Sequence, residues 1–584
     1  MGVAAPQLRS IRVSRRNAKP AFAERQGPGC EPQRPAGARV GFLALTYTDG
    51  VGSPADTSCA CRPWLAVTLA LTALLQIVVV NFWPGFESPN ERARAYQALA
   101  VAGRGSLEIG PEVERFGGME DLAVTAGGVF PNKAPGMLPL LLPGAAIARA
   151  VAGPNPEAEL RLTLVLDRLV ASSLPFALCV LLLALHTGER FPRGAPLAVA
   201  AYALATPALA ASLLLFSHAL SACLLLAGFL LLFGRQRPRW QAAPLAGALL
   251  AWAAVCEYPV ALPAAVLALV ALPRLRVRGA LAGLLGGAVP MALLGIYNLA
   301  CFGSPLAIST AHESYGAFAA LVRRGFFGLS WPTPGGLAGL LASPSRGLLA
   351  WAPLVALAAL GAVRRRTGAE GRGSTVALVT APLVLLVAMS GYPNWHGGWF
   401  AGPRYLLPVL PLLFVLVAGG AERLATSRWG GAATAVAALW GWLQVWPVVA
   451  SFPFPPEDHP LPFATLARGL LADGILVPSW LPPPVEAVVL AVLAAGAAVL
   501  LFTLATGGAR PLERAVAVGL SLIALGLVLG VRAPVTWKAA LERAVIRDVY
   551  TRSGKGALEA LLPRADTPER RAALEAWIAL RDRP

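Results

Sequence analysis

The chain has 584 residues, of which 56% are hydrophobic and 14% are charged. An ordinary soluble domain carries about 25% charged residues, so this composition excludes a cytosolic enzyme and a nucleic-acid-binding module. The formal net charge of +18 does not indicate a nucleic-acid partner, because the basic residues stand in short clusters between long apolar runs. Composition therefore predicts an all-α polytopic membrane protein whose first partner is the lipid bilayer.

The first 63 residues are rich in Arg, Pro and Gly. They predict a disordered basic cytoplasmic leader, or an over-extended start of the reading frame. A cleavable signal peptide is not expected, because the first apolar run begins only near Trp64 and no clear small-x-small cleavage site follows it.

Apolar runs of membrane-spanning length follow from residue 64 onward. A helix that crosses a hydrocarbon core of about 30 Å needs roughly 20 apolar residues at about 1.5 Å each. We therefore expect about 13 transmembrane helices. They are predicted at 64–83, 166–187, 195–216, 218–234, 241–257, 258–273, 279–300, 346–363, 374–391, 405–421, 430–451, 484–506 and 514–531.

Basic clusters between these runs predict the orientation. Cytoplasmic loops carry an excess of Lys and Arg, and with a cytoplasmic N-terminus every cluster falls on the cytoplasmic face. The C-terminus is then extracytoplasmic. The clusters are the leader, Arg190/Arg193, Arg235/Arg237/Arg239, Arg274/Arg276/Arg278, Arg364/Arg365/Arg366, Arg423/Arg428 and Arg510/Arg514.

One apolar stretch, Pro135 to Val151, would break this alternation if it crossed the membrane. We therefore predict a re-entrant or interfacial segment at 135–151, because backbone at membrane depth is tolerated only where it packs against protein or lines a cavity. The large loops at 84–165, 301–345 and 452–483 then lie on the extracytoplasmic side.

The tail after residue 531 predicts two helices, 536–550 and 567–581, the second with Thr567 as N-cap and Pro568 at the first helical position. The predicted organisation is a leader (1–63), a membrane domain (64–531) whose first outer loop is 84–165, and an extracytoplasmic helical tail (532–584).

Charged motifs concentrate in the first outer loop. This loop contains FESPNERARAY at 86–96, GMEDLA at 118–123 and GVFPNKAPG at 128–136. Two later motifs are SPSRGL at 343–348 and NWHGGWFAGPRY at 394–405. A carboxylate just past the first span, an Arg three residues on, a nearby aromatic residue and a Lys-x-Pro-Gly segment together resemble the GT-C glycosyltransferases.

The resemblance covers roughly residues 64–531 and is closest to the protein O-mannosyltransferase and aminoarabinose transferase branch. The motifs at 343–348 and 394–405 are similar to signatures of uncharacterised bacterial members. It implies an inverting glycosyltransferase of the bacterial cytoplasmic (inner) membrane that acts on its outer face. The implied donor is a polyprenyl-phosphate sugar, and the implied acceptor is a glycan, a lipid or a protein.

In that superfamily an acidic residue of the first outer loop is the catalytic base. The resemblance therefore points to Glu91, with Glu87 in reserve, although Asn90-Glu91 stands where the mannosyltransferase branch has Asp-Glu. Sugar transfer from a lipid phosphate needs a base for the acceptor's proton and cations for the leaving phosphate. The expected substrate-binding residues are Arg94, Asp121, Lys133, His396 and Arg404, with Lys133 and Arg404 at the phosphate.

These residues also have structural interpretations. Ser88 and Glu91 fit a capping box with Pro89 at the first helical position, and Arg94 can pair with Glu91 on the helix surface.

Other candidates lie near the ends of predicted spans. Lys133 can extend to the headgroup layer, and Arg404 can anchor a span at the interface. His218 and Glu257 lie at or near outer span ends, where an ionisable group indicates either a function or helix packing.

No metal or other cofactor is predicted. Cys59 and Cys61 have no His or second Cys pair nearby, and three adjacent residues at 457–459 cannot easily converge on one ion. The alternative function is a polytopic transporter or flippase for a lipid-linked saccharide. Paired broken helices at mid-membrane would have favoured transport, whereas the charged first outer loop favours a transferase.

Overall fold

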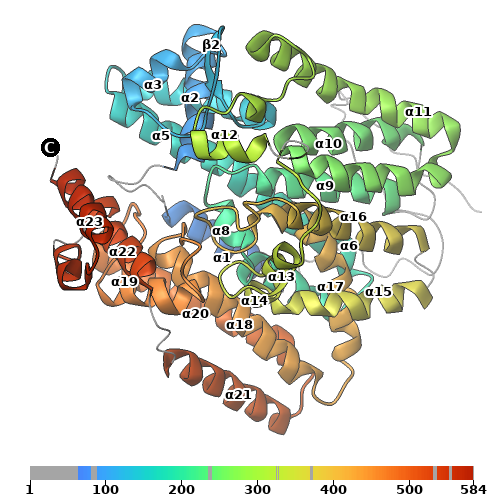
Figure 1. The fold of residues 1–584 in the computed structure, drawn as a ribbon. Coiled ribbons are helices and arrows are strands. Elements are labelled where there is room, and N and C mark those ends of the chain that lie inside the picture. Colours follow the sequence, from blue (N-terminus) through green and yellow to red (C-terminus); the bar gives the residue numbers. More distant parts are fainter. Residues whose placement is uncertain are drawn as a thin grey trace, which may run out of the picture. The chain divides into compact units, whose positions relative to one another are not determined.

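The computed structural model describes residues 63–79, 88–234, 240–323, 325, 328–367, 372–530, 536–551 and 556–582. All of them belong to one compact unit. Of the predicted leader only Pro63 is described, and Glu87 also lies outside the described residues. The elements in this part of the chain are helices and one two-stranded hairpin (Figure 1).

Helices make up nearly all of the elements along the chain. The first half contains α1 (Pro63–Val78), α2 (Pro89–Arg104), α3 (Gly110–Phe116), β1 (Leu122–Thr125), β2 (Gly128–Pro131), η1 (Pro135–Met137), α4 (Leu138–Ala152), α5 (Pro156–Arg168), η2 (Leu169–Ser173), α6 (Leu174–Gly188), α7 (Gly194–Leu204), α8 (Ala208–Ser212), α9 (His218–Phe233), η3 (Trp240–Ala242), α10 (Ala243–Cys256), η4 (Tyr258–Val260) and α11 (Ala261–Phe302). The second half contains η5 (Ser309–His312), α12 (Gly316–Val322), α13 (Pro334–Ala342), α14 (Leu348–Trp351), η6 (Pro353–Ala356), α15 (Leu357–Thr367), α16 (Arg372–Ser390), η7 (Arg404–Val409), α17 (Leu410–Leu424), α18 (Gly430–Ser451), η8 (Phe463–Ala467), α19 (Arg468–Ala472), α20 (Pro483–Thr506), α21 (Pro511–Gly530), α22 (Trp537–Val545), η9 (Ile546–Tyr550), η10 (Glu559–Arg564) and α23 (Pro568–Arg581).

Seven helical segments in the described part of the chain are long and apolar enough to cross a membrane, and six apolar helices are shorter. The predicted number of 13 spans is therefore not confirmed, because several predicted runs form helices too short to cross on their own or meet at a kink without a loop. The seven segments are Pro135–Ala152, Pro156–Gly188, Tyr258–Phe302, Arg372–Ser390, Arg404–Leu424, Gly430–Ser451 and Pro483–Thr506.

The predicted span 195–216 is broken between α7 and α8. Pro207 has no backbone N–H and disfavours helical geometry at the residue before it. The Thr206 hydroxyl donates to the Tyr202 carbonyl at 2.8 Å and accepts from the Ala208 N–H at 3.3 Å. The side chain thus replaces part of the helical hydrogen bonding at the break.

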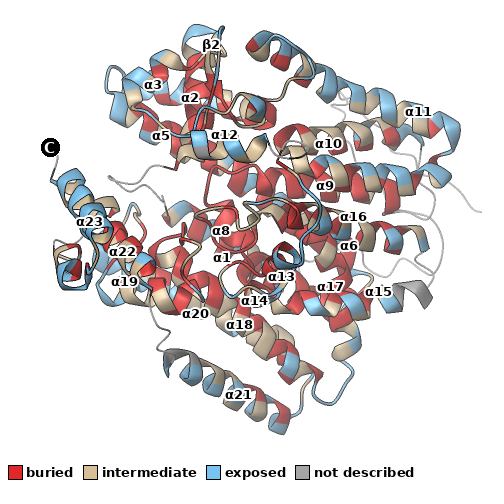
Figure 2. Cartoon of the chain, viewed as in Figure 1, coloured by how far each residue is buried: buried red, intermediate tan, exposed pale blue. Residues whose placement is uncertain are grey.

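The predicted spans 258–273 and 279–300 lie on the two sides of a kink in α11. Arg276 interrupts this helix with φ 55° and ψ 175°, a left-handed φ that costs a non-glycine residue about 1 kcal/mol or more. The chain therefore turns within a basic segment without a separate loop. Much of α11 is exposed (Figure 2).

The centre of the bundle contains α7, α8, α9 and α17, whose residues are mostly buried (Figure 2). A Cβ on Gly194 would lie 2.2 Å from the Ala418 carbonyl oxygen, so only glycine permits this approach of α7 to α17. The Glu422 carboxylate accepts the backbone N–H groups of Arg193 and Gly194, both at 2.8 Å. It therefore satisfies free donors at the start of α7.

The predicted first outer loop contains α2, α3 and the β1–β2 hairpin, and α2 packs into the main core of the bundle. Strands β1 and β2 pair antiparallel with Leu122 opposite Pro131, and Gly128 supplies the φ of 129° after the turn. A single bridge between Ala123 and Glu313 brings the chain after α11 to the edge of this hairpin. This bridge places Glu313 next to the hairpin, whose Ala123 and Phe130 pack against Tyr297 and Cys301 of α11.

The C-terminal tail forms the two predicted helical stretches, α22 with η9 and then α23. Thr567 caps α23 by accepting the Arg570 N–H, with Pro568 at the first helical position, which confirms that predicted N-cap. Asp473 joins the tail to the chain before it, through Arg543 at 3.3 Å and Arg547 at 3.1 Å.

Candidate active site

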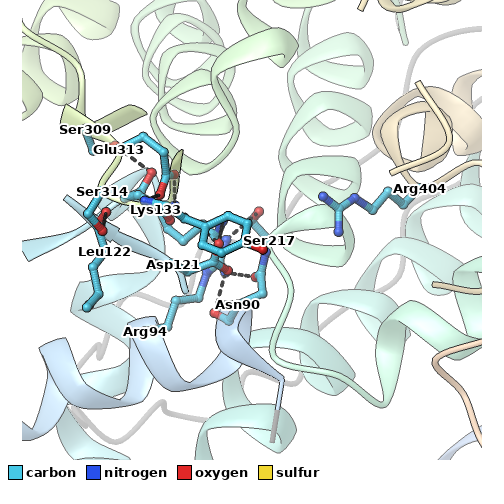
Figure 3. A network of polar contacts seen from close by, with 12 residues as sticks. Asn90, Arg94, Asp121, Leu122, Lys133, Ser217, Ser309, Glu313, Ser314 and Arg404 are labelled. Carbon is cyan, nitrogen blue, oxygen red and sulfur yellow. Dashed lines mark hydrogen bonds and ion pairs between the residues drawn. The ribbon is translucent and has the colours of Figure 1, made fainter. Parts of the chain in front are cut away.

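Polar side chains from α2, the β1–β2 hairpin, the start of α9 and the chain after α11 meet in one network, and Arg404 faces it (Figure 3). The local sequence explains these positions. Pro89 opens α2 at its first position, which places Asn90 and Arg94 in the first turns of that helix. Pro135 starts η1 directly after the hairpin and so holds Lys133 beside β2.

Asp121 and Lys133 form the centre of this site, with 2.9 Å between Nζ and Oδ1. The Asn132 amide donates to the same oxygen at 3.3 Å. Among the described residues, no hydrogen bond reaches the second oxygen of Asp121. Burial would raise the pKa of Asp121, but the Lys133 ammonium and the hydrogen bonds from Lys133 and Asn132 outweigh it and hold the pKa below its usual value. Asp121 is therefore ionised at neutral pH.

The backbone beyond Lys133 is fixed to α10. The Trp252 indole N–H donates to the Gly136 carbonyl at 2.8 Å. A Cβ on Gly136 would lie 2.6 Å from the backbone nitrogen of Cys256. This close approach sets the hairpin next to Glu257, the residue that follows Cys256.

Glu313 is a third acidic residue of the network, and it was not among the predicted site residues. The Asn132 amide donates to its carboxylate, and its carboxylate accepts the Tyr315 N–H at 3.1 Å. Burial raises the pKa of Glu313, and the neighbouring Asp121 adds to the rise. Glu313 is the only acidic residue in the loop 301–345, a signal by which the sequence alone could have indicated it.

Arg94 lies on the other side of the site and joins α2 to α9. Its guanidinium donates to the carbonyl and side-chain oxygens of Asn90 and, at 3.2 Å, to the Ser217 hydroxyl. It does not pair with Glu91 on the helix surface. The Ser217 hydroxyl in turn donates to Glu257.

Glu257 is the second carboxylate that faces the basic side chains. His218 Nδ1 lies 3.7 Å from its Oε2, the same oxygen that accepts from Ser217. The side chain of Glu257 is 21% exposed. In the described part of the chain its Oε1 has no hydrogen-bond donor, so this oxygen can accept a proton.

Arg404 points toward this network from the start of η7 (Figure 3). Its guanidinium donates to the Tyr405 hydroxyl at 3.2 Å and lies over the Tyr405 and Phe216 rings, at 5.0 and 6.0 Å from their centroids. Its buried Nε has no hydrogen-bond partner. No described carboxylate forms an ion pair with Arg404, which leaves its positive charge available to a ligand.

Glu91 lies apart from these groups and is 2% exposed. Its carboxylate accepts Nε and Nη2 of Arg168 at 2.8 and 2.9 Å and the Leu215 N–H at 2.7 Å. Ser88 is the N-cap of α2 but makes no side-chain cap hydrogen bond. The contacts of Glu91 therefore fit neither an open base nor the capping box, but a buried ion pair between α2 and α5.

His396 also lies outside the network. Its Nδ1 accepts the Gly398 N–H at 3.3 Å, and burial lowers its pKa. The electrostatic neighbours of His396 are Glu457, Arg346, Arg404 and Asp458. His396 thus belongs to the segment that carries Arg404 rather than to the Asp121 side of the site.

No group of three or more His, Cys, Asp or Glu side chains in the described ranges is arranged to bind a metal ion. The site instead combines two carboxylates that each have an uncommitted oxygen with the cations Arg94, Lys133 and Arg404. Helices of membrane-spanning length and this charged cluster define a polytopic helical protein with groups suited to proton transfer and anion binding.

Comparison with known proteins gives limited similarity. No protein-family model matches the chain, and no curated protein matches it. The archaeal oligosaccharyltransferase AglB from Archaeoglobus fulgidus, in complex with an inhibitory peptide and a dolichol-phosphate, is 13% identical with a TM-score of 0.34, over 90% of this chain and 60% of that chain.

Two further structures of the A. fulgidus oligosaccharyltransferase are each 14% identical with a TM-score of 0.35. The apo form matches over 90% of this chain and 60% of that chain. The form tethered by a disulfide bond to an acceptor peptide with the NVT sequon matches over 77% of this chain and 56% of that chain. This chain thus spans about 60% of the length of these structures, and similarity at this level does not transfer a function.

Proposed function

We propose that this chain is a GT-C-type membrane glycosyltransferase of the bacterial cytoplasmic (inner) membrane. In this proposal it transfers a sugar from a polyprenyl-phosphate donor to a glycan, lipid or protein acceptor on the outer face. The observation that supports it most is the site in which Asp121 and Glu257 face Arg94, Lys133 and Arg404. A base and cations are what displacement of a lipid phosphate requires.

The proposed reaction is a single in-line displacement. The acceptor hydroxyl attacks the anomeric carbon, and its proton passes to a carboxylate of the enzyme. The bond between the anomeric carbon and the phosphate oxygen breaks, and its electron pair stays on the phosphate. Preorganised cations stabilise this developing charge. Arg404 is our first choice for that role because it is not engaged by a carboxylate, and Lys133 is the second.

The identity of the base follows from which carboxylate has a free oxygen. Asp121 is ionised and is bound at only one oxygen, so we assign it as the base, with Glu257 as the alternative. The assignment of Glu91 from the sequence resemblance stays a prediction. Its bonds to Arg168 and to the Leu215 N–H leave it poorly placed to receive a proton.

The test compares Asp121→Asn, Glu257→Gln and Glu91→Gln in nanodiscs with a panel of radiolabelled polyprenyl-phosphate hexoses and pentoses. Mass spectrometry of envelope glycans from cells with and without the protein would identify the acceptor. We expect Asp121→Asn to lower the transfer rate by about 10²- to 10⁴-fold, as loss of a general base does. If Glu91→Gln alone is inactive while remaining folded, the base is Glu91. If all three variants support a normal envelope, the transferase is contradicted and a transporter or flippase is favoured.

We also propose that the reaction needs no divalent metal. The Lys133 ammonium lies against the Asp121 oxygen that a cation would otherwise occupy. Transfer should therefore continue unchanged in EDTA, and added Mg²⁺ or Mn²⁺ should not raise the rate. Loss of activity in EDTA that Mn²⁺ restores would contradict this part of the proposal.

A further inference from the structure

Arg346 is a buried cation in the SPSRGL motif, with a relative exposure of 0%. Its guanidinium donates hydrogen bonds to four backbone carbonyls. Nε donates to His396 at 3.2 Å, Nη1 to Ser345 at 2.9 Å, and Nη2 to Gly398 at 2.9 Å and to Pro455 at 2.8 Å. Among the described residues no carboxylate forms an ion pair with it. One guanidinium therefore joins three separate segments of backbone.

Two of these carbonyls flank a turn that requires glycine. Gly397 and Gly398 have φ values of 77° and 70°, in the left-handed region that other residues adopt at a cost. Arg346 binds the carbonyl of His396, which precedes the two glycines, and the carbonyl of Gly398. It thus fixes the turn from both sides.

The turn lies directly against the side chain of Arg404. A Cβ on Gly397 would lie 2.9 Å from Cγ and Nε of Arg404. The aliphatic part of Arg404 therefore rests on the glycine backbone, while its guanidinium reaches toward the Asp121 side of the site (Figure 3). Movement of the turn would move this cation.

We infer that Arg346 is a positioning residue that sets Arg404 for the donor phosphate by holding the Gly397–Gly398 turn. This inference rests on the proposed function for its effect on the donor. Arg346 contributes no contact to the ligand, since its donors are used by carbonyls. A lysine at this position keeps the positive charge. It lacks the planar guanidinium whose N–H groups bind the three backbone segments.

The first measurement is hydrogen exchange of residues 394–403 in the whole protein without ligand. Arg346→Lys should raise exchange there, and Gly397→Ala should do the same with Arg346 intact. The matched control is Arg190→Lys, because Arg190 also donates to backbone carbonyls, those of His186 and Gly234. Unchanged exchange at 394–403 in Arg346→Lys would overturn the inference, whatever the protein's function.

The second measurement is binding of a short-chain polyprenyl phosphate without sugar to the protein in nanodiscs. Arg346→Lys loses several of the hydrogen bonds that the Arg346 guanidinium donates to backbone carbonyls. We therefore expect this variant to bind the polyprenyl phosphate about tenfold more weakly. Because it acts through Arg404, the double variant Arg346→Lys/Arg404→Lys should bind no more weakly than Arg404→Lys alone. Additive losses would overturn the inference while the proposed function stands. No binding by the parent would instead contradict the proposed function.

Discussion

Glu91 and Arg168 form an ion pair almost closed to solvent, with side-chain exposures of 3% and 8%. Removing one member of such a pair leaves an uncompensated buried charge and costs about 3 to 5 kcal/mol. We therefore expect Glu91→Ala to lower the unfolding temperature of the detergent-solubilised protein strongly. Removing both charges in Glu91→Leu/Arg168→Met should recover much of that loss. A Glu91→Ala protein as stable as its parent would contradict the structural role.

The sequence could indicate part of this site because Asp121 and Lys133 lie in one loop. Their neighbours come from far along the chain. Arg168 is 77 residues from Glu91, and Glu313 is 181 residues from Asn132. Such pairings depend on which helices pack together, and no local pattern encodes them. A resemblance in a short motif therefore pointed to Glu91 without revealing the partner that buries it.

Helix positions can be predicted from local sequence, but the number of membrane spans cannot. Apolar length predicts where helices form, and caps such as Thr567 can be recognised because they act within one turn. The number of spans is harder to predict, because Pro207 ends α7 early, while the kink at Arg276 separates the two apolar parts of α11 without a loop between them. Both outcomes depend on how the surrounding helices pack around these breaks.

In the C-terminal tail, helix α22 places Glu542 beside His459, and the charges of these two groups depend on pH. Glu542 Oε2 lies 3.8 Å from Nε2 of His459. Burial, reinforced by Asp458, raises the pKa of Glu542 to about 8. Burial lowers the pKa of His459 to about 4. Lys538 pairs with Asp458 at 2.5 Å and lowers the pKa of Glu542, whereas Arg543 and Arg346 lower that of His459.

The two shifts act in opposite directions. Because the pKa of Glu542 is raised, its contribution to the stability of the docked helix is complete below its ordinary pKa of 4.5. This contribution is lost as the pH rises through about 8. Because the pKa of His459 is lowered, its contribution to the stability of the docked helix is complete above its ordinary pKa of 6.5. This contribution is lost as the pH falls through about 4. Docking of α22 should therefore weaken between pH 6.5 and about 8.

Hydrogen exchange of residues 537–550 as a function of pH would measure this docking. We expect exchange, corrected for its intrinsic pH dependence, to rise between pH 6.5 and 8.5 in the parent. Glu542→Gln should remove most of that rise, because the amide cannot ionise. Glu559→Gln is the matched control, since Glu559 lies in the same tail and pairs with Arg581 at 2.7 Å. A rise that persists in Glu542→Gln would mean that another group is responsible.

The arrangement of α4, α5 and α6 bears on how the whole molecule lies in the membrane. The segment Pro156–Gly188 has 33 residues and so extends about 50 Å, well beyond a hydrocarbon core of about 30 Å. Its first part, α5, carries five charged residues and its last part, α6, is apolar. The membrane should therefore enclose α6 and leave α5 outside.

Helix α4 packs alongside α5, and this contact supports placing the Pro135–Ala152 segment at the outer surface, although its length would also allow it to cross.

We expect a cysteine introduced at the exposed Pro154 to react with a membrane-impermeant maleimide added to intact cells. A cysteine at the exposed Ala425, between α17 and α18, should react only after permeabilisation. With Cys30, Cys59 and Cys61 replaced by Ser, the parent is a suitable blank, because the four described cysteines are buried. Protection at Pro154 with Ala425 unchanged would mean that α4 crosses the membrane, whereas labelling of Ala425 from outside would reverse the predicted orientation.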